Sequence, residues 1–259
     1  NVAEVPAADG SYDDWCSVIA VDPTDQAVMY AGGSRKLART TNGGATAADW
    51  TDISTGVHAD QQDLIFDPNN ADTLLLANDG GVYVSTDQGT TWEFRPRTLQ
   101  ITQFYGIDVS AQDPAIIAGG AQDNGTYYRM RTSAWRHQSW GDGTVARIDP
   151  NDSQIVYFSS QNPINTNAAG VTTSNVRKST DGLQTHNAIG STGLSGSSPF
   201  IAMLALDQSS RATPATTRVI FLGGTNQLFR SIDGAQNWAR VNDAAGNAFT
   251  TDGVPSVVV

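Results

Sequence analysis

One pattern recurs five times along the 259 residues. Each copy contains an apolar run that ends at Asp-Pro or a similar turn, a second run that ends at Gly-Gly or a polar loop, and a third run. The third run leads, in the complete copies, into Ser/Thr-x-Asp/Asn, Gly and Trp. The clearest copy spans Leu64 to Trp92 and the last spans Val219 to Trp238. Four short strands that repeat roughly every 45 residues are the signature of a β-propeller, in which each repeat is one blade. The sequence therefore predicts an all-β fold of four-stranded antiparallel blades around a channel, with essentially no helix.

The repeats place about five blades in one domain or fragment, residues 1–259. The first strand of each repeat is a short, continuous apolar run, so we expect the inner strands to be buried on both faces. A polar insertion at residues 161–175 is either an added contact loop or a tolerated surface excursion. A propeller needs a closed ring. Five blades can close one, but the trailing strand favours a larger ring with blades missing at one or both ends. The expected blades are residues 14–54, 60–97, 103–139, 142–188 and 200–242, with the start of another at 254–259.

Composition excludes several classes of function. The net charge is −11 with a pI near 4.4, which argues against nucleic acid, because neutralising phosphates needs a basic face. No apolar run approaches 18 residues, so we expect no membrane span. Cys16 is the single cysteine, which leaves no intrachain disulfide and no cysteine metal cluster, and we expect it to be a buried hydrophobe. No calcium-loop pattern is present, and we expect no metal and no cofactor.

The ends of the chain and its acidity indicate its parent protein, its location and the charge of its ligands. The chain has no initiator Met and no signal peptide, and it ends at Val259 within an apolar run. We therefore expect a mature fragment or a processed piece of a larger protein, secreted or at the cell surface. Further blades or domains of that protein would be its partners. An acidic protein also favours neutral or cationic ligands.

The turn motif carries a resemblance to a known superfamily. Residues 85–92, STDQGTTW, resemble the Asp-box, or BNR repeat, of sialidases, xyloglucanases and sortilin. Residues 231–238 are a near match, residues 179–186 place His186 where Trp would stand, and residues 40–44 have Asn for Asp. In such a turn the carboxylate accepts backbone N–H bonds, Gly supplies positive φ and Trp packs between sheets. The residues expected to be structural in this way are Asn42, Asp87, Asp181 and Asp233.

Within that superfamily the chain is most similar to glycoside hydrolase family 74 and related secreted bacterial propellers. Residues 15–23 followed by 30–33 resemble the blade openings of that family. Asp14 stands broadly where those enzymes carry a catalytic aspartate, although they assemble their cleft between two propellers and this chain has at most one. The Arg-Ile-Pro motif and the arginine triad of sialidases are absent from the sequence.

Strand alternation brings two sets of loops to one rim of the predicted propeller. Loops that enter inner strands and loops that join second to third strands share this rim, whereas the Asp-boxes and Asp-Pro turns lie on the opposite one. Carboxylates and aromatic residues converge on the first rim. Each aspartate could instead cap its own loop, and each tryptophan could pack between blades. The candidate catalytic residues are Asp14, Asp60 and Asp142, and the candidate ligand-binding residues are Trp15, His58, Asp79, Asp123 and Trp140.

Three functions fit this rim. A carbohydrate-active propeller is the leading hypothesis, either a glycosidase that uses paired carboxylates or a relic that only binds glycans. The alternatives are a sortilin-like, non-catalytic module that binds a peptide or protein at the channel mouth, and a structural blade array in a larger surface protein. The Asp-box itself implies no chemistry, because unrelated activities share it.

Overall fold

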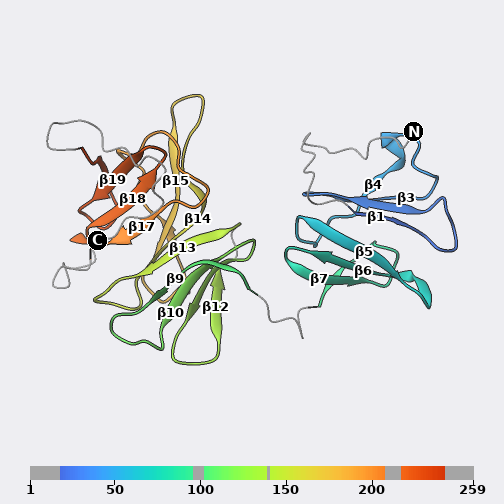
Figure 1. Cartoon of the computed structure of the whole chain (residues 1–259), viewed down its shortest axis with the longest axis horizontal. Helices are drawn as coiled ribbons and strands as arrows, with labels where there is room; N and C mark the ends of the chain where they lie inside the picture. The colour runs from blue at the N-terminus through green and yellow to red at the C-terminus, as the bar shows by residue number, and fades with distance from the viewer. Residues whose placement is uncertain (1–17, 96–101, 139–140, 208–216, 243–259) are drawn as a thin grey trace. The chain divides into compact units, whose positions relative to one another are not determined.

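The computed structural model describes residues 18–95, 102–138, 141–207 and 217–242. These residues form twenty β-strands, labelled β1 to β20, and one short 3₁₀ helix, η1 (Ala47–Asp49), with no α-helix among them. The strands assemble into five four-stranded antiparallel sheets (Figure 1). The predicted fold class is confirmed: the chain is all-β, with the four-stranded blades of a partial β-propeller.

The chain divides into two compact units, Asn1–Ile101 and Thr102–Val259. The first unit holds two sheets, in each of which the strands follow chain order. Sheet 1 consists of β1 (Val18–Val21), β2 (Met29–Gly32), β3 (Leu37–Thr40) and β4 (Thr51–Asp52). Sheet 2 consists of β5 (Gln61–Asp67), β6 (Asn70–Asn78), β7 (Gly81–Ser85) and β8 (Glu93–Phe94).

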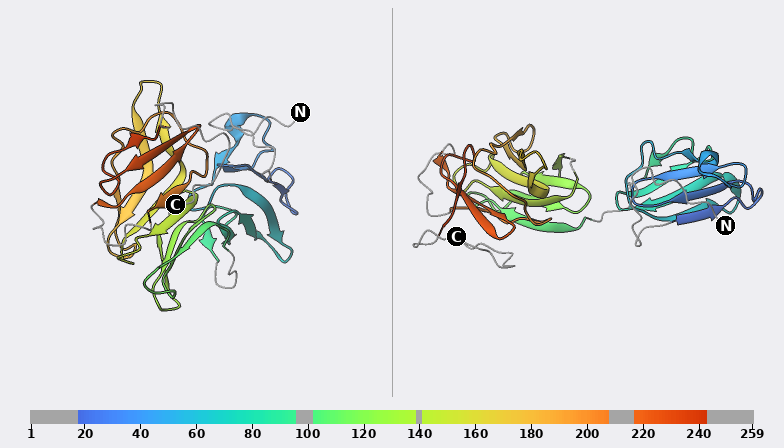
Figure 2. Two further views of the ribbon diagram at one scale, coloured as in Figure 1. Left: turned by 60° about the vertical axis from the view of Figure 1, so that its left-hand side comes forward. Right: turned by 90° about the horizontal axis from the view of Figure 1, so that it is seen from above.

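The second unit holds three sheets, which lie side by side in chain order (Figures 1 and 2). Sheet 3 consists of β9 (Phe104–Val109), β10 (Ile117–Ala121), β11 (Gly125–Arg129) and β12 (Trp135–Gln138). Sheet 4 consists of β13 (Gly143–Ile148), β14 (Val156–Thr166), β15 (Thr172–Ser179) and β16 (Asn187–Ala188). Sheet 5 consists of β17 (Leu204–Leu206), β18 (Ile220–Gly224), β19 (Gln227–Ser231) and β20 (Ala239–Arg240).

Apolar side chains between neighbouring sheets make the core of each unit. In the first unit Tyr30, Leu74 and Leu76 are fully buried between sheets 1 and 2. In the second unit successive residues of β14 serve two different cores. Phe158 packs toward sheet 3, whereas Tyr157 belongs to the core shared with sheet 5. Because neighbouring side chains of a strand point to opposite faces, sheet 4 is covered on both sides.

The inner strands are not all buried on both faces, so that expectation is wrong for three of them. Strands β13 and β17 are buried on both faces. In contrast, Ile19 of β1, Ile65 of β5 and Ile107 of β9 are 67%, 53% and 59% exposed. The reason lies in the packing within each unit. Strands β1 and β5 contact each other and β9 contacts β13, so one neighbouring sheet of the same unit covers each of these three strands.

The polar insertion at residues 161–175 extends a β-hairpin. Strands β14 and β15 continue through it and pair from Ile164 to Thr166, beyond a register shift between Ser159 and Ile164. At the tip the side-chain oxygen of Asn167 accepts the backbone N–H groups of Ala169 and Val171, each at 3.0 Å. The hairpin projects from the sheet (Figure 1). Pairing in the ladder satisfies the backbone of the polar residues toward the tip. At the base, Ile164 is 1% exposed and belongs to the core shared with sheet 5.

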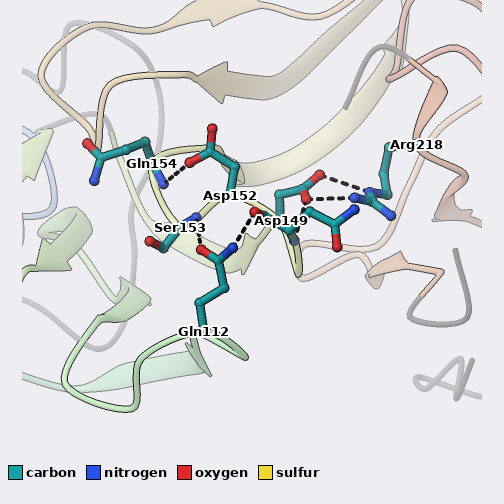
Figure 3. A network of polar contacts seen from close by, with 7 residues as sticks. Gln112, Asp149, Asp152, Ser153, Gln154 and Arg218 are labelled. Carbon is teal, nitrogen blue, oxygen red and sulfur yellow. Dashed lines mark hydrogen bonds and ion pairs between the residues drawn. The ribbon is translucent and has the colours of Figure 1, made fainter. Parts of the chain in front are cut away.

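A buried ion pair joins sheets 4 and 5 at the Asp-Pro turn after β13. Nε of Arg218 donates to Oδ2 of Asp149 at 2.8 Å, and an NH2 hydrogen donates to Oδ1 at 2.7 Å (Figure 3). Both side chains are 0% exposed. Asp149 also accepts the backbone N–H of Asn151. Nearby, Gln112 of the turn after β9 accepts the N–H of Ser153, so sheet 3 is tied to the same turn.

We predict that Arg218→Met strongly destabilises the protein. The substitution leaves the Asp149 carboxylate buried without its cation, which typically costs about 3–5 kcal/mol. Equilibrium denaturation in urea, compared with the wild type, measures this loss. Replacing both partners, as Asp149→Leu with Arg218→Met, should recover most of it, because no unpaired charge is then buried.

Lys36→Met is the matched control. Lys36 pairs with Asp52 at 2.8 Å, but the two side chains are 40% and 48% exposed, so we expect a change below about 1 kcal/mol. Equal losses in Arg218→Met and Lys36→Met would contradict the role of the buried pair.

Candidate functional site

The turns between third and fourth strands use their carboxylates internally. After β7, Ser85 Oγ donates to Asp87 Oδ1 at 2.7 Å and accepts the N–H of Gly89 at 2.8 Å. Asp87 Oδ1 then accepts the N–H of Thr91 at 2.8 Å. Equivalent bonds occur after β15 and β19, where Asp181 accepts the N–H of Thr185 and Asp233 that of Asn237. These three aspartates hold their own turns closed.

The corresponding turn of sheet 1 is a variant of this arrangement. Asn42 Oδ1 accepts the hydroxyl of Thr40 at 2.9 Å and the N–H of Gly44 at 3.3 Å. Its amide nitrogen donates to Asp49 Oδ1 at 2.7 Å, which ties the turn to η1. An amide that both accepts and donates can therefore stand where the other turns have a carboxylate.

The aromatic positions after these turns differ between sheets. Trp238 is 6% exposed and donates its indole N–H to the carbonyl of Gly190 at 2.9 Å. Trp92 packs against the core of the first unit, and His186 stands at this position in sheet 4. Sheet 3 lacks the Ser-x-Asp turn, and its Trp135 is 43% exposed.

The rim of the first unit brings together two of the candidate carboxylates. Asp60 precedes β5 with a φ of 64°, and Asp79 lies in the turn between β6 and β7. Carboxylate oxygens of Asp60 and Asp79 lie within 4.8 Å of each other. Gln62 donates its side-chain N–H to Asp79 at 2.9 Å. Both aspartates are half-buried, so they are within reach of solvent and of each other.

His58 belongs to the packing of that rim. Its ring lies against Gly80, where an added Cβ would approach the His58 Cβ to 2.4 Å. Its backbone carbonyl accepts the side-chain N–H groups of Gln61 and Asn78, at 2.7 and 3.1 Å. These contacts fix the loop that presents Asp60.

The rim of the second unit combines carboxylates with aromatic rings. Asp123, with a φ of 58° between β10 and β11, donates its backbone N–H to Asp142 Oδ1 at 3.1 Å. Burial raises the pKa of the Tyr105 hydroxyl, and the negative charges of Asp142 and Asp123 raise it further. The ring of Tyr105 meets that of Phe200 edge to face, with centroids 6.3 Å apart. Phe200 is 45% exposed, so the rim has an open aromatic wall.

Gln161 and Asn162 support this wall from the base of the hairpin. Asn162, with a φ of 48°, donates its N–H to the carbonyl of Phe200 at 2.9 Å. Gln161 donates its N–H to the carbonyl of Asp142, and its side chain lies against Gly141. Its amide oxygen is buried without a hydrogen-bond partner among the described residues.

Within each unit the structure brings two of the predicted site residues together. It brings Asp60 together with Asp79 in one unit, and Asp123 together with Asp142 in the other. Three predicted residues, Asp14, Trp15 and Trp140, lie outside the described residues.

Sequence reasoning missed two aromatic residues of the second rim. Tyr105 is the second residue of inner strand β9, but it was not among the predicted site residues. Phe200 follows a run of Gly and Ser and precedes the inner strand β17. Its position before an inner strand could therefore have identified it as a rim residue.

One carboxyl lies along the inner strands and was also not foreseen. Asp108 of β9 accepts the backbone N–H of Ile148 on β13 at 2.8 Å. Burial raises the pKa of this carboxyl, and the N–H bond and Arg147 oppose that effect. The bond links the inner strands of sheets 3 and 4, which belong to different sheets and do not pair with each other.

Comparisons with known proteins give a consistent set of structural neighbours. No family model and no curated protein sequence matches the chain. A GH74 xyloglucanase from Xanthomonas campestris aligns with 86% of this chain and 40% of its own, at 16% identity and a TM-score of 0.48. An ancestral GH74 enzyme aligns with 86% and 32%, at 15% identity and a TM-score of 0.37.

A GH74 enzyme from Niastella koreensis aligns with 89% of this chain and 51% of its own, at 16% identity and a TM-score of 0.31. The chain thus spans about half or less of the length of these proteins. No helix among the described residues is long and apolar enough to cross a membrane.

We predict that Asp87→Ala destabilises the first unit by roughly 1–3 kcal/mol, because the N–H of Thr91 and the hydroxyl of Ser85 lose their acceptor. Thermal and urea denaturation measure the loss. Asp63→Ala is the control, since Asp63 is exposed and makes no side-chain hydrogen bond among the described residues. Ligand binding should be unchanged, and a binding defect without destabilisation would refute the structural role of Asp87.

We also predict acid sensitivity from the other two turns. Hydrogen bonds from Thr185 lower the pKa of Asp181 from 3.8 to about 2, and hydrogen bonds from Asn237 lower that of Asp233 to about 2. A carboxyl with a depressed folded pKa stabilises the fold above its unfolded value and loses that contribution as the pH falls through the folded one. Stability should therefore decline between about pH 4 and about pH 2. Carboxyl titration by NMR checks both values, and a midpoint near 4 for either group would contradict the prediction.

Proposed function

We propose that the chain is a secreted carbohydrate-active propeller that binds a neutral glycan at the rim of its second unit. The observation that carries the proposal is the grouping of Asp123, Asp142, Tyr105 and Phe200 at the loops that enter inner strands or join second to third strands.

The chemistry of these groups suits a sugar. One carboxylate oxygen of Asp142 accepts the N–H of Asp123. A carboxylate has further lone pairs that can accept hydrogen bonds from sugar hydroxyls. The exposed ring of Phe200, held edge-on by Tyr105, offers an apolar face on which a pyranose ring stacks. Trp140, which directly precedes this rim in the sequence, is proposed as a further stacking residue. Trp15 remains a proposed ligand-binding residue of the first unit.

The negative charge of the chain favours a neutral sugar over an acidic one as the ligand. The chain carries a net charge of −11, and the rim of the second unit presents carboxylates. Acidic sugars would meet unfavourable charge there, whereas neutral hydroxyls only donate hydrogen bonds to the same carboxylates.

Hydrolysis is a second candidate, and the pair Asp60 and Asp79 favours it. Their carboxylate oxygens lie within 4.8 Å, and retaining glycosidases place their two carboxyl groups about 5–5.5 Å apart. Asp14 and Asp142 remain the other proposed catalytic carboxylates. A peptide-binding module is a third candidate, for which the projecting hairpin of β14 and β15 would be the contact element.

Binding of β-1,4-glucan and xyloglucan oligosaccharides, measured by isothermal titration calorimetry, tests the leading proposal. We expect Phe200→Ala to weaken binding roughly tenfold, which corresponds to about 1.4 kcal/mol, and Trp140→Ala combined with Asp142→Asn to abolish it. In both variants the thermal midpoint should stay within a few degrees of the wild type.

Trp135→Ala is the matched control. Trp135 is 43% exposed in the same unit, close to the 45% of Phe200, but it lies on outer strand β12. Equal weakening by Trp135→Ala and Phe200→Ala would place the ligand elsewhere. Oligosaccharide products that disappear in Asp60→Asn would establish hydrolysis. Binding to a peptide array, with no glycan bound, would favour the interaction module.

A further inference from the structure

His186 occupies a position that tryptophan fills in sheet 5. It follows Asp181 by five residues, as Trp238 follows Asp233. Trp238 is buried and hydrogen-bonded through its indole N–H. The His186 ring instead meets the edge of Phe158, with ring centroids 5.4 Å apart and planes at 88°. Phe158 is 2% exposed and belongs to the core between sheets 3 and 4. His186 therefore contacts the aromatic edge of that core.

The turn that carries His186 also places Leu183, which is 1% exposed, in the same core. Sheet 3 adds hydrogen bonds to this turn. Nη1 of Arg136, on β12, donates to the carbonyl oxygens of Asp181 and Gly182 at 3.0 and 2.6 Å. Gln138, two residues on, donates its side-chain N–H to the carbonyl of Leu183 at 3.1 Å. The turn is thus the outer contact of sheet 4 with β12, and His186 stands at its end.

The surroundings of His186 suit a neutral ring. Its Nδ1 atom is buried without a hydrogen-bond partner among the described residues. The charged groups around it are Arg177 from β15, Asp181 from its own turn, and Arg136 bound to that turn from β12. A neutral imidazole leaves Nδ1 as an unpaired acceptor. A protonated imidazole carries a hydrogen on Nδ1 as well. That N–H donor would have no acceptor, and it would lie near the positive charge of Arg177.

We propose that His186 makes the joint between sheets 3 and 4 acid-sensitive: when the ring takes up a proton, the turn at residues 181–186 loosens from Phe158 and from β12. The inference concerns the fold of the second unit and does not depend on the identity of any ligand. Loosening of this joint would also affect the rim of the second unit. There the N–H of Asp123, in sheet 3, donates to the carboxylate of Asp142, at the start of sheet 4.

The direction of the pH dependence follows from the surroundings. Burial and, next, the charge of Arg177 lower the pKa of His186 below its usual 6.5, while Asp181 partly opposes them. The unfolded chain then binds the proton more readily than the folded one. The contribution of neutral His186 to stability is complete above the unfolded value, and it is lost as the pH falls toward the folded value.

The experiment compares urea denaturation at about pH 7.5 and about pH 5, the range in which histidine changes charge. We expect the wild-type midpoint to fall at the lower pH and the fall to be largely absent in His186→Phe, which keeps an aromatic ring but cannot be protonated. His186→Trp, which restores the residue used in sheet 5, is the second variant and should behave like His186→Phe.

His137→Phe is the control. His137 is exposed and stacks on Tyr127 at 4.6 Å, so its replacement should leave the fall unchanged.

A second readout locates the effect. The chain has three histidines, so the NMR signals of their ring Cε1–H groups can be assigned by substitution. We expect His186 to titrate below the usual histidine range, and amide hydrogen exchange on β12 and at residues 181–186 to show easier opening at about pH 5 in the wild type alone. Titration of His186 at or above its usual pKa would overturn the proposal. So would an equal acid-induced fall in His186→Phe and the wild type.

Discussion

A four-stranded sheet buries each of its two faces only where another sheet lies against that face, and the structure of each unit depends on this constraint. Sheet 4 meets it on both sides, because Phe158 and Tyr157 point from neighbouring positions of β14 into two different cores. The contacts at its ends then hold the sheets in place. The Asp149–Arg218 pair joins sheets 4 and 5, and Arg136 joins sheet 3 to the turn of sheet 4. Packing thus covers the faces of the sheets, and these polar contacts join neighbouring sheets.

The carboxylates of the chain divide into two groups by what they bind. Asp87, Asp181 and Asp233 accept two or more hydrogen bonds within their own turns, and these bonds lower the pKa of each carboxyl. Little of their hydrogen-bonding capacity remains for a ligand. Asp142 accepts a bond from another loop, and Asp79 accepts one from Gln62, so each retains lone pairs at the rim. The same side-chain type therefore serves turn geometry at one position and is open to ligand chemistry at another.

The sequence was sufficient for features that arise within one repeat. Strand order and the all-β class follow from runs of a few residues and the turns between them, and the bonds of Asp87 to Ser85 and Thr91 span at most four residues. Features that join distant residues were not predictable from the pattern. Arg218 and Asp149 are 69 positions apart, and nothing in the residues around either one identifies its partner. Phe200 and Tyr105 likewise meet only because sheets 3 and 5 flank sheet 4.

Two departures from the sequence expectations have the same physical origin. The apolar runs of β1, β5 and β9 predicted burial on both faces, but Ile19, Ile65 and Ile107 are exposed. An apolar run does not reveal how many sheets cover the strand that it forms. The insertion at residues 161–175 is polar, yet its Thr and Asn residues pair in a ladder, because backbone hydrogen bonds suffice for a hairpin rooted in a packed sheet. Gln161 and Asn162 lie in the register shift between the two paired parts of this ladder, and the N–H of Asn162 donates to the carbonyl of Phe200. The base of this polar hairpin thereby binds the loop of the aromatic residue on which the proposed glycan site depends.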